Sequence, residues 1–195
     1  MGDYDDLNGS ACHSRSVFHQ RGQWFVVVDG ISSDRGGRTV QATWHCHPNA
    51  TVSNTSTTTT GTVFTITGAD GKTGLPSEAQ LSIIPATGAQ ASSWNVGSSV
   101  VKGVFKNQSA ANEYQGWYSA SYDDAVAAPV VVHDAQMSAN ETQAVFAWLL
   151  LASPTPQTQV SASAEITSFS AGIADISVTV DGLVTNISVP VESCE

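Results

Sequence analysis

The sequence predicts an all-β fold, an antiparallel β-sandwich that forms a single domain over residues 1–195. Three observations indicate this class. Ser, Thr, Gly, Ala and Val dominate the composition and only 12% of the residues are charged, which is typical of sheets. Short runs of alternating polar and apolar residues recur along the chain, with turn residues between them. No segment carries the apolar period of an amphipathic helix.

The elements follow from these runs in order. Strands are expected at 10–18, 24–29 and 39–48. A polar low-complexity stretch follows at 49–60, and its Thr-rich part at 55–60 is expected to be an exposed loop. A strand at 62–67 precedes a turn at 68–74, where Asp70 and Gly71 favour a hairpin connection. Further strands are expected at 79–84, 99–105, 115–121, 129–133, 143–152, 160–169, 172–180 and 183–190. Residues 152–195 are too few for a core of their own and are expected to pack on the same domain.

The charge of the chain restricts its partners. Seventeen acidic and seven basic residues give a net charge of −10, which repels nucleic acid at long range. The longest apolar run, 145–152, is shorter than the roughly 20 residues that cross a bilayer, so no membrane span is predicted. An anionic ligand needs a local basic patch. Four of the seven basic residues lie early in the chain, where they are equally explained as solvated turn and edge residues: Arg15, Arg21, Arg35 and Arg38.

N-glycosylation sequons are unusually frequent. Six of the eight asparagines begin an Asn-x-Ser/Thr sequence: Asn8, Asn49, Asn54, Asn107, Asn140 and Asn186. This frequency predicts a secreted, extracellular glycoprotein. The chain opens without a positively charged, apolar signal segment. Either the sequence is a fragment of a larger protein or the sequons are accidental.

The chain has three cysteines. In an oxidising compartment we expect a disulfide between Cys12 and Cys46, because each neighbours a histidine on what are expected to be adjacent strands. Cys194 is then free or intermolecular. The alternative is that all three are buried as small apolar residues.

Metal-ligand side chains recur in the first three strands. His13, Asp29 and His45 follow one another at intervals of sixteen residues, and His47 lies two positions further. Neutral imidazole and carboxylate are the ligands that Zn²⁺ prefers when cysteine is not used. If the strand faces coincide, the three side chains converge on a metal site. The alternative is three ordinary polar residues at strand ends.

Five short motifs occur in a recognisable order within residues 8–152: His-x-Arg-x-Val from His13, Trp-Phe-Val-Val-Val-Asp from Trp24, Trp-His-x-His-Pro from Trp44, Gln115 to Ser119, and the strand 145–151. Together they resemble the C-terminal β-sandwich of heparinase II/III-type polysaccharide lyases. The resemblance implies a structural zinc ion held by His13, Asp29 and His45, with His47 as the alternative third ligand. It also implies a uronic-acid polysaccharide as the substrate class and β-elimination as the reaction.

The sequence departs from this family where catalysis is concerned. The family's catalytic tyrosine and histidine come mainly from a helical toroid, and Ala11 stands where many members place a catalytic histidine. We therefore expect no catalytic residue in this chain. The prediction is a non-catalytic extracellular β-sandwich that binds polysaccharide or another glycan, with Trp117 as a contact, or that self-associates into a matrix or filament. The alternative is the C-terminal part of a polysaccharide lyase that is active only with its toroid domain.

Overall fold

The computed structural model describes residues 2–6, 9–58, 61–68, 79–88, 97–105, 114–155 and 161–191. Within these ranges the chain forms antiparallel β-sheets joined by turns, which confirms the predicted all-β sandwich. None of these residues belongs to a helix of the length and apolarity that a membrane crossing requires.

A seven-stranded sheet forms the middle layer. Its strand order is β1 (Gly2–Asp6), β2 (Gly9–Gln20), β3 (Trp24–Ser33), β14 (Gln143–Ser153), β7 (Gln80–Pro85), β6 (Gly61–Thr67) and β5 (Thr51–Thr58). β3 and β14 lie at its centre, paired in register from Trp24 opposite Leu151 to Ser32 opposite Gln143. Both strands are rich in apolar residues on both faces, which is typical of a strand that is covered on both sides.

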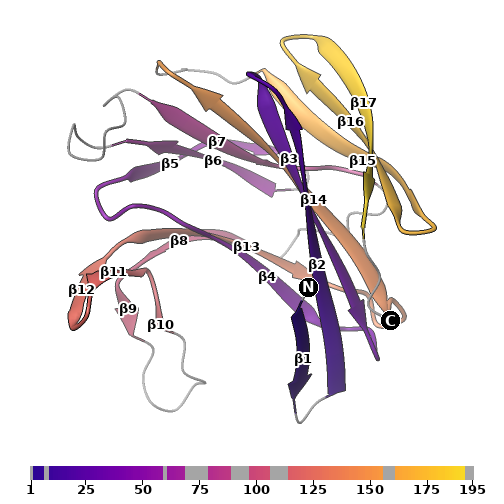
Figure 1. Cartoon of the computed structure of the whole chain (residues 1–195), viewed down its shortest axis with the longest axis horizontal. Coiled ribbons are helices and arrows are strands. Elements are labelled where there is room, and N and C mark those ends of the chain that lie inside the picture. Colours follow the sequence, from indigo (N-terminus) through magenta and orange to yellow (C-terminus); the bar gives the residue numbers. More distant parts are fainter. Residues whose placement is uncertain are drawn as a thin grey trace.

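Two three-stranded sheets cover the middle layer, one on each side (Figure 1). One has the order β4 (Thr39–His45), β13 (Pro129–Gln136) and β8 (Gly97–Lys102), and the other the order β15 (Ala162–Ser170), β16 (Ile173–Val180) and β17 (Leu183–Pro190). Two small hairpins lie beyond β8 and β13: β9 (Val104–Phe105) with β10 (Tyr114–Gln115), and β11 (Trp117–Ser121) with β12 (Asp124–Ala127). The result is a three-layer sandwich.

Strand alternation divides the interior into two cores. Val26 and Val28 face the β15–β17 sheet, where they join a cluster with Ile166 and Ile176. Val27 points the other way, into a cluster toward the β4–β13–β8 sheet. Phe146 and Trp148 of β14 belong to that second cluster and are completely buried. The strands β15 and β16 therefore share a core cluster with β3.

Several element predictions need correction. The sequence predicts no strand within the polar stretch 49–60 and an exposed loop at 55–60, yet Thr51–Thr58 is strand β5, paired with β6. Its Ser and Thr side chains suit an edge strand, because an exposed edge does not need apolar residues. Strands β1 and β12 were not predicted. The predicted turn at 68–74 lies, except for Gly68, outside the described residues.

Two glycines interrupt strands that the sequence predicted as continuous. Gly103 ends β8 and Gly116 separates β10 from β11, and both have positive φ, 61° and 80°. The amide of Gly103 donates to the carbonyl of Gly116 at 2.8 Å. A β-carbon at Gly116 would lie 2.6 Å from the Gly103 nitrogen. The two backbones therefore approach so closely that only glycine fits at position 116.

Candidate ligand-binding site between the sheets

A pocket of about 440 Å³ lies where the edge strand β4 faces strands β2 and β3. We call it the inter-sheet pocket. It is lined by Ala11, Cys12, His13, Arg15, Asp29, Ile31, Arg38, Thr39, Val40, Gln41, Ala42, Thr43 and Trp148. Its volume is in the range of small-ligand sites. The lining combines apolar walls with four titratable side chains, so the pocket suits an amphipathic polar ligand.

Asp29 is the centre of the charged part of this pocket. It is 4% exposed and lies directly opposite Arg15 in the β2–β3 register. Arg15 donates from Nε to Oδ1 at 2.6 Å and from Nη2 to Oδ2 at 2.7 Å. The Nε2 atom of His13 lies 3.1 Å from Oδ1. Both carboxylate oxygens of Asp29 therefore have partners, and the arginine grips them in the bidentate geometry that gives the strongest charged hydrogen bonds.

Arg15 is held from a second side by an aromatic ring. Its guanidinium carbon lies 5.6 Å from the ring centroid of Trp44 on β4, within the distance at which a cation and an aromatic ring attract. The hydrogen bonds to Asp29 raise the pKa of Arg15 further above its ordinary value, and partial burial opposes this rise. Arg15 thus carries a permanent positive charge that connects β2, β3 and β4.

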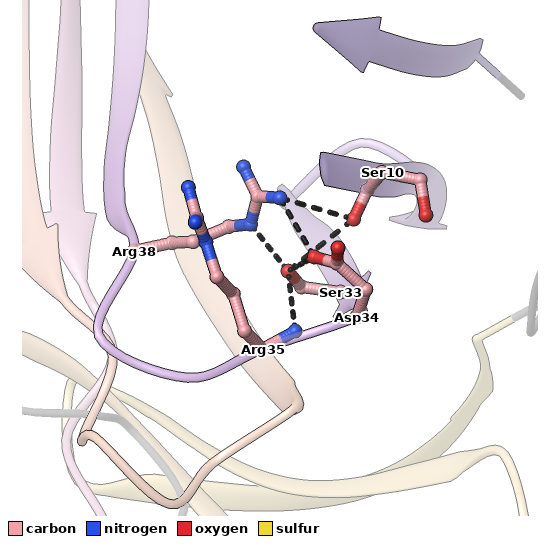
Figure 2. A network of polar contacts seen from close by, with 5 residues as sticks. All are labelled: Ser10, Ser33, Asp34, Arg35 and Arg38. Carbon is pink, nitrogen blue, oxygen red and sulfur yellow. Dashed lines mark hydrogen bonds and ion pairs between the residues drawn. The ribbon is translucent and has the colours of Figure 1, made fainter. Parts of the chain in front are cut away.

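Arg38 forms a second polar network at the pocket edge (Figure 2). Its Nη2 donates to Asp34 Oδ1 at 2.8 Å and to the Ser10 carbonyl at 3.2 Å, and its Nε donates to the hydroxyl of Ser33. The Asp34 amide also donates to the Ser10 carbonyl, at 3.1 Å. These contacts fix the loop after β3 against the start of β2 and place a second arginine on the pocket wall.

The stability of the protein is expected to fall in acid because of two carboxylates. The hydrogen bond from Arg38 lowers the pKa of Asp34, and hydrogen bonds from Ser168 and Ser188 lower the pKa of Asp175. A lowered pKa stabilises the fold above the unfolded-state value near 4, and this contribution is lost as the pH falls through the folded-state pKa. The melting temperature should therefore drop below about pH 4. Replacing Asp34 by Asn should make that drop smaller; an unchanged profile would contradict this assignment.

The predicted zinc ligands are only partly brought together. His13 and Asp29 touch, but His45 belongs to β4, in another sheet, and is exposed. His47 is also exposed, and its ring lies 5.7 Å, centroid to centroid, from the ring of Tyr118 in a tilted arrangement. No group of three His, Cys, Asp or Glu residues that could hold a metal ion occurs in the described part of the chain. Arg15 already occupies both oxygens of Asp29, so this donor set does not fit zinc. Metal analysis of the purified protein tests whether the chain binds zinc.

The predicted disulfide between Cys12 and Cys46 is wrong. Cys12 is disulfide-bonded, whereas Cys46 is a buried free thiol. The one further cysteine of the chain, Cys194, lies outside the described residues. Cys12 alternates with His13 and Arg15 along β2, so its side chain lies on the strand face away from β4, although the residue also borders the inter-sheet pocket. Cys46 packs with Phe64 and Val131 on the opposite side, so the middle layer separates the two sulfurs.

Thiol labelling is expected to separate these cysteines. Burial raises the pKa of the Cys46 thiol, and a protonated, covered thiol reacts slowly with iodoacetamide. Intact-mass analysis should show no label on the folded protein at pH 8 and a single label after unfolding without reductant. Cys12 should react only after reduction. Labelling of Cys12 in unreduced protein would contradict the assignment.

A second pocket adjoins the first at Gln41. It has a volume of about 330 Å³ and is lined by Gln41, Ser99, Val101, Val104, Gln115, Val132 and Asp134. We call it the amide pocket. Gln115 donates from Nε2 to Gln41 Oε1 at 2.7 Å, and Gln41 donates from Nε2 to Asp134 Oδ1 at 2.9 Å. This chain of side chains crosses from β10 through β4 to β13. It offers the donors and acceptors that sugar hydroxyl groups need.

The remaining predicted residues are distributed over the surface. Trp117 lies half-buried on β11, with its indole N–H donating to the Val104 carbonyl at 3.4 Å. Four sequon asparagines are exposed: Asn49, Asn54, Asn140 and Asn186. Asn8 and Asn107 belong to the residues whose side chains are not described. Exposure is what glycan attachment requires, and attachment itself stays a prediction, as does the role of Trp117.

Sequence reasoning missed the residues of the amide pocket. Gln41, Gln115 and Asp134 come from three strands that are far apart in the sequence, and of the three only Gln115 lies in a motif, the one from Gln115 to Ser119. The early cluster of arginines did carry a signal for the other pocket, because Arg15 and Arg38 both line it. Arg21 and Arg35 are exposed in turns, as the simpler interpretation of the cluster predicted.

Comparisons with known proteins find the same fold in solved heparinase structures. No family model and no curated protein matches the chain. Among solved structures, it is similar to heparinase III, with a TM-score of 0.67, 15% identity, and coverage of 97% of this chain and 25% of the other. The heparan sulfate lyase HepC from Pedobacter heparinus gives a TM-score of 0.64, 16% identity, and coverage of 99% and 26%.

A third structure, the heparinase III product of the BT4657 gene, gives a TM-score of 0.64 at 17% identity and coverage of 97% and 25%. The chain therefore spans about a quarter of the length of these lyases. At this identity the likeness concerns the fold alone. The predicted resemblance is confirmed at that level: the chain has a heparinase-like β-sandwich.

Proposed function

We propose that this protein is a non-catalytic, carbohydrate-associated β-sandwich that binds an acidic glycan across strand β4. The observation that carries the proposal is the pair of arginines that line the inter-sheet pocket, Arg15 and Arg38, in a chain whose net charge is −10. A uronate carboxylate needs such a local positive site, because the field of the whole protein repels it.

The geometry of Arg15 leaves it able to bind a ligand. Its hydrogen bonds to Asp29 use Nε and Nη2, while a guanidinium has five N–H donors in total. The Arg15 side chain is 43% exposed, and Asp29 beneath it is almost buried. A ligand carboxylate can therefore approach the outer edge of the guanidinium without displacing Asp29.

Uncharged groups around the arginines suit the rest of a sugar unit. Thr39, Gln41 and Thr43 lie on one face of β4, at positions that alternate along the strand. Gln41 connects the inter-sheet pocket to the amide pocket, where Gln115 and Asp134 continue the polar surface. Adjacent pockets of this kind match successive units of an oligosaccharide, with the acidic unit beside the arginines.

The same pocket does not suit β-elimination. That reaction needs one group that removes the C5 proton and another that protonates the leaving oxygen. Apart from Asp29, His13 is the one pocket residue of a kind that commonly transfers protons. Its Nε2 atom already lies against Asp29. Ala11, which stands where the resembling lyases place a histidine, lines the pocket as a methyl group. Binding without cleavage is the expected behaviour.

Titration calorimetry with acidic oligosaccharides tests the proposal. Heparan sulfate and alginate hexasaccharides should bind, and a neutral cello-oligosaccharide of equal length should bind more weakly. Binding should weaken as salt is added, since the contact is electrostatic. Incubation with heparan sulfate or alginate should release no unsaturated uronate, measured by ultraviolet absorbance.

Two variants with the same net charge provide the control. Arg38→Gln removes a pocket residue, whereas Arg21→Gln removes an exposed turn residue. Arg38→Gln should weaken acidic glycan binding about tenfold, the value of one charged hydrogen bond, and Arg21→Gln should change it little. Equal effects of both variants, or no binding of either acidic probe, would refute the proposal.

The extracellular location is part of the same proposal. The exposed sequons and the disulfide of Cys12 support a secreted glycoprotein. Intact-mass measurement before and after enzymatic deglycosylation of protein made in a eukaryotic host tests it.

We also propose that the protein can self-associate into a matrix or filament. The sheet edges at β5 and β8 are where strands of another copy can pair. A strictly monomeric protein at high concentration would exclude this self-association.

A second candidate is a domain of a complete polysaccharide lyase. It is favoured by the coverage: almost all of this chain matches only about a quarter of each similar lyase. In that case the arginines would hold substrate for catalytic groups on a helical domain. A parent gene that encodes several hundred helical residues before this segment would support this candidate, and a gene without them would exclude it.

A further inference from the structure

The surroundings of Asp29 differ from those of a metal ligand. A carboxylate that binds zinc presents an oxygen to the ion at about 2.0–2.2 Å. Here Oδ1 accepts from Arg15 Nε at 2.6 Å and Oδ2 accepts from Arg15 Nη2 at 2.7 Å. Within the described residues, the one imidazole in contact with Asp29 is that of His13, which lies against the same Oδ1 atom at 3.1 Å. A divalent ion at this carboxylate would have to displace a guanidinium or sit beside it.

We propose that Arg15 takes the place of a metal ion in this protein, so that the cluster of His13, Arg15 and Asp29 is held together without metal. The buried carboxylate of Asp29 requires a positive partner, because an unpaired buried charge is strongly destabilising. A guanidinium meets this requirement permanently, and its planar fork matches the two carboxylate oxygens.

The position of Arg15 supports this substitution. It lies directly opposite Asp29 across the β2–β3 pair, on the same face as His13 two residues earlier. Its guanidinium also packs against the Trp44 ring on β4, at 5.6 Å. A metal site would connect the two sheets through a third ligand from β4. Arg15 makes that connection through Trp44 instead, and His45 remains on the outside.

Metal analysis with thermal denaturation tests the inference on the full 195-residue chain. The purified wild-type protein should contain far less than one zinc ion per chain, and a chelator should leave its melting temperature unchanged. Arg15→Gln should lower the melting temperature by about 3–8 °C, since it leaves Asp29 without its charge partner, and added zinc should not restore it.

Arg15→His provides the decisive variant. It places a second imidazole two residues from His13, opposite Asp29, and so completes a set of three zinc ligands on one face. Added zinc should raise the melting temperature of this variant by about 5–10 °C at a free concentration a hundredfold above Kd. Arg15→Gln, the matched control, should not respond.

Two results would overturn the inference. One is stoichiometric zinc in the wild-type protein together with a chelator-induced fall in melting temperature. The other is a folded Arg15→His variant, shown by an unchanged circular dichroism spectrum, that does not respond to zinc. Glycan binding by the wild-type protein is not involved in either result, so this inference and the proposed function can fail separately.

Discussion

Replacing Trp148 by alanine is expected to lower the free energy of unfolding by about 3–5 kcal/mol. Trp148 is completely buried between the middle sheet and the β4–β13–β8 sheet. Its ring meets Trp44 edge-on at 5.6 Å and lies 6.4 Å from the ring of His133, centroid to centroid. Removal of the indole leaves a cavity that the rigid strands on both sides cannot close.

Urea denaturation measures this loss as a shift of the midpoint. Trp117→Ala is the matched control, because Trp117 is half-buried on the peripheral hairpin of β11 and β12. It should cost less than half as much. If Trp148→Ala cost less than about 0.5 kcal/mol, the usual limit for a surface change, Trp148 would not be the centre of this core.

The second large effect is expected for Gly88→Ala, with a loss of about 2–4 kcal/mol from backbone strain and overpacking combined. Gly88 has a φ of +124°, and a β-carbon there would lie 2.1 Å from the carbonyl oxygen of Ile166. At this point β7 meets β15: Thr87 and Ile166 are joined by a hydrogen bond of 2.7 Å. The substitution should therefore loosen the β15–β17 sheet from the middle layer.

Gly22→Ala separates the cost of backbone strain from the cost of steric overlap. Gly22 also has a positive φ, +75°, but a β-carbon there meets nothing within 4 Å. Its cost should be limited to that of placing a side chain in the left-handed region, about 1 kcal/mol. Equal losses of stability for the two variants, measured by urea denaturation, would show that the contact between β7 and β15 is not close.

The strands with continuous apolar runs could be predicted from the sequence. Residues 24–29, 129–133 and 143–152 are apolar runs that must be covered on both faces, and they form β3, β13 and β14. The breaks at Gly103 and Gly116 could not be predicted, because a glycine within a strand pattern shows its positive φ only when the neighbouring backbone is placed. The Ser and Thr residues of β5 resemble a loop until β6 is beside them.

Individual residues of the candidate site could be predicted from the sequence, but their arrangement in space could not. Alternation correctly placed Trp44 and Cys46 on the inner face of their strand. It could not show that this strand belongs to a different sheet from β2 and β3. For that reason the sequence could not show that His45 lies in another sheet than His13 and Asp29, or that Cys12 and Cys46 do not form a disulfide. Arg15 was visible in the sequence, but its role depends on the β2–β3 register that sets it opposite Asp29.

The proposal of acidic glycan binding across β4 is tested most directly by nuclear magnetic resonance titration of the isotope-labelled chain with a uronate-containing tetrasaccharide. Saturable shifts should appear at the amides of Thr39, Gln41 and Thr43 and at the side-chain signals of Arg15 and Arg38, the residues that line the inter-sheet pocket. Shifts confined to other strands, or none at millimolar sugar, would contradict the account.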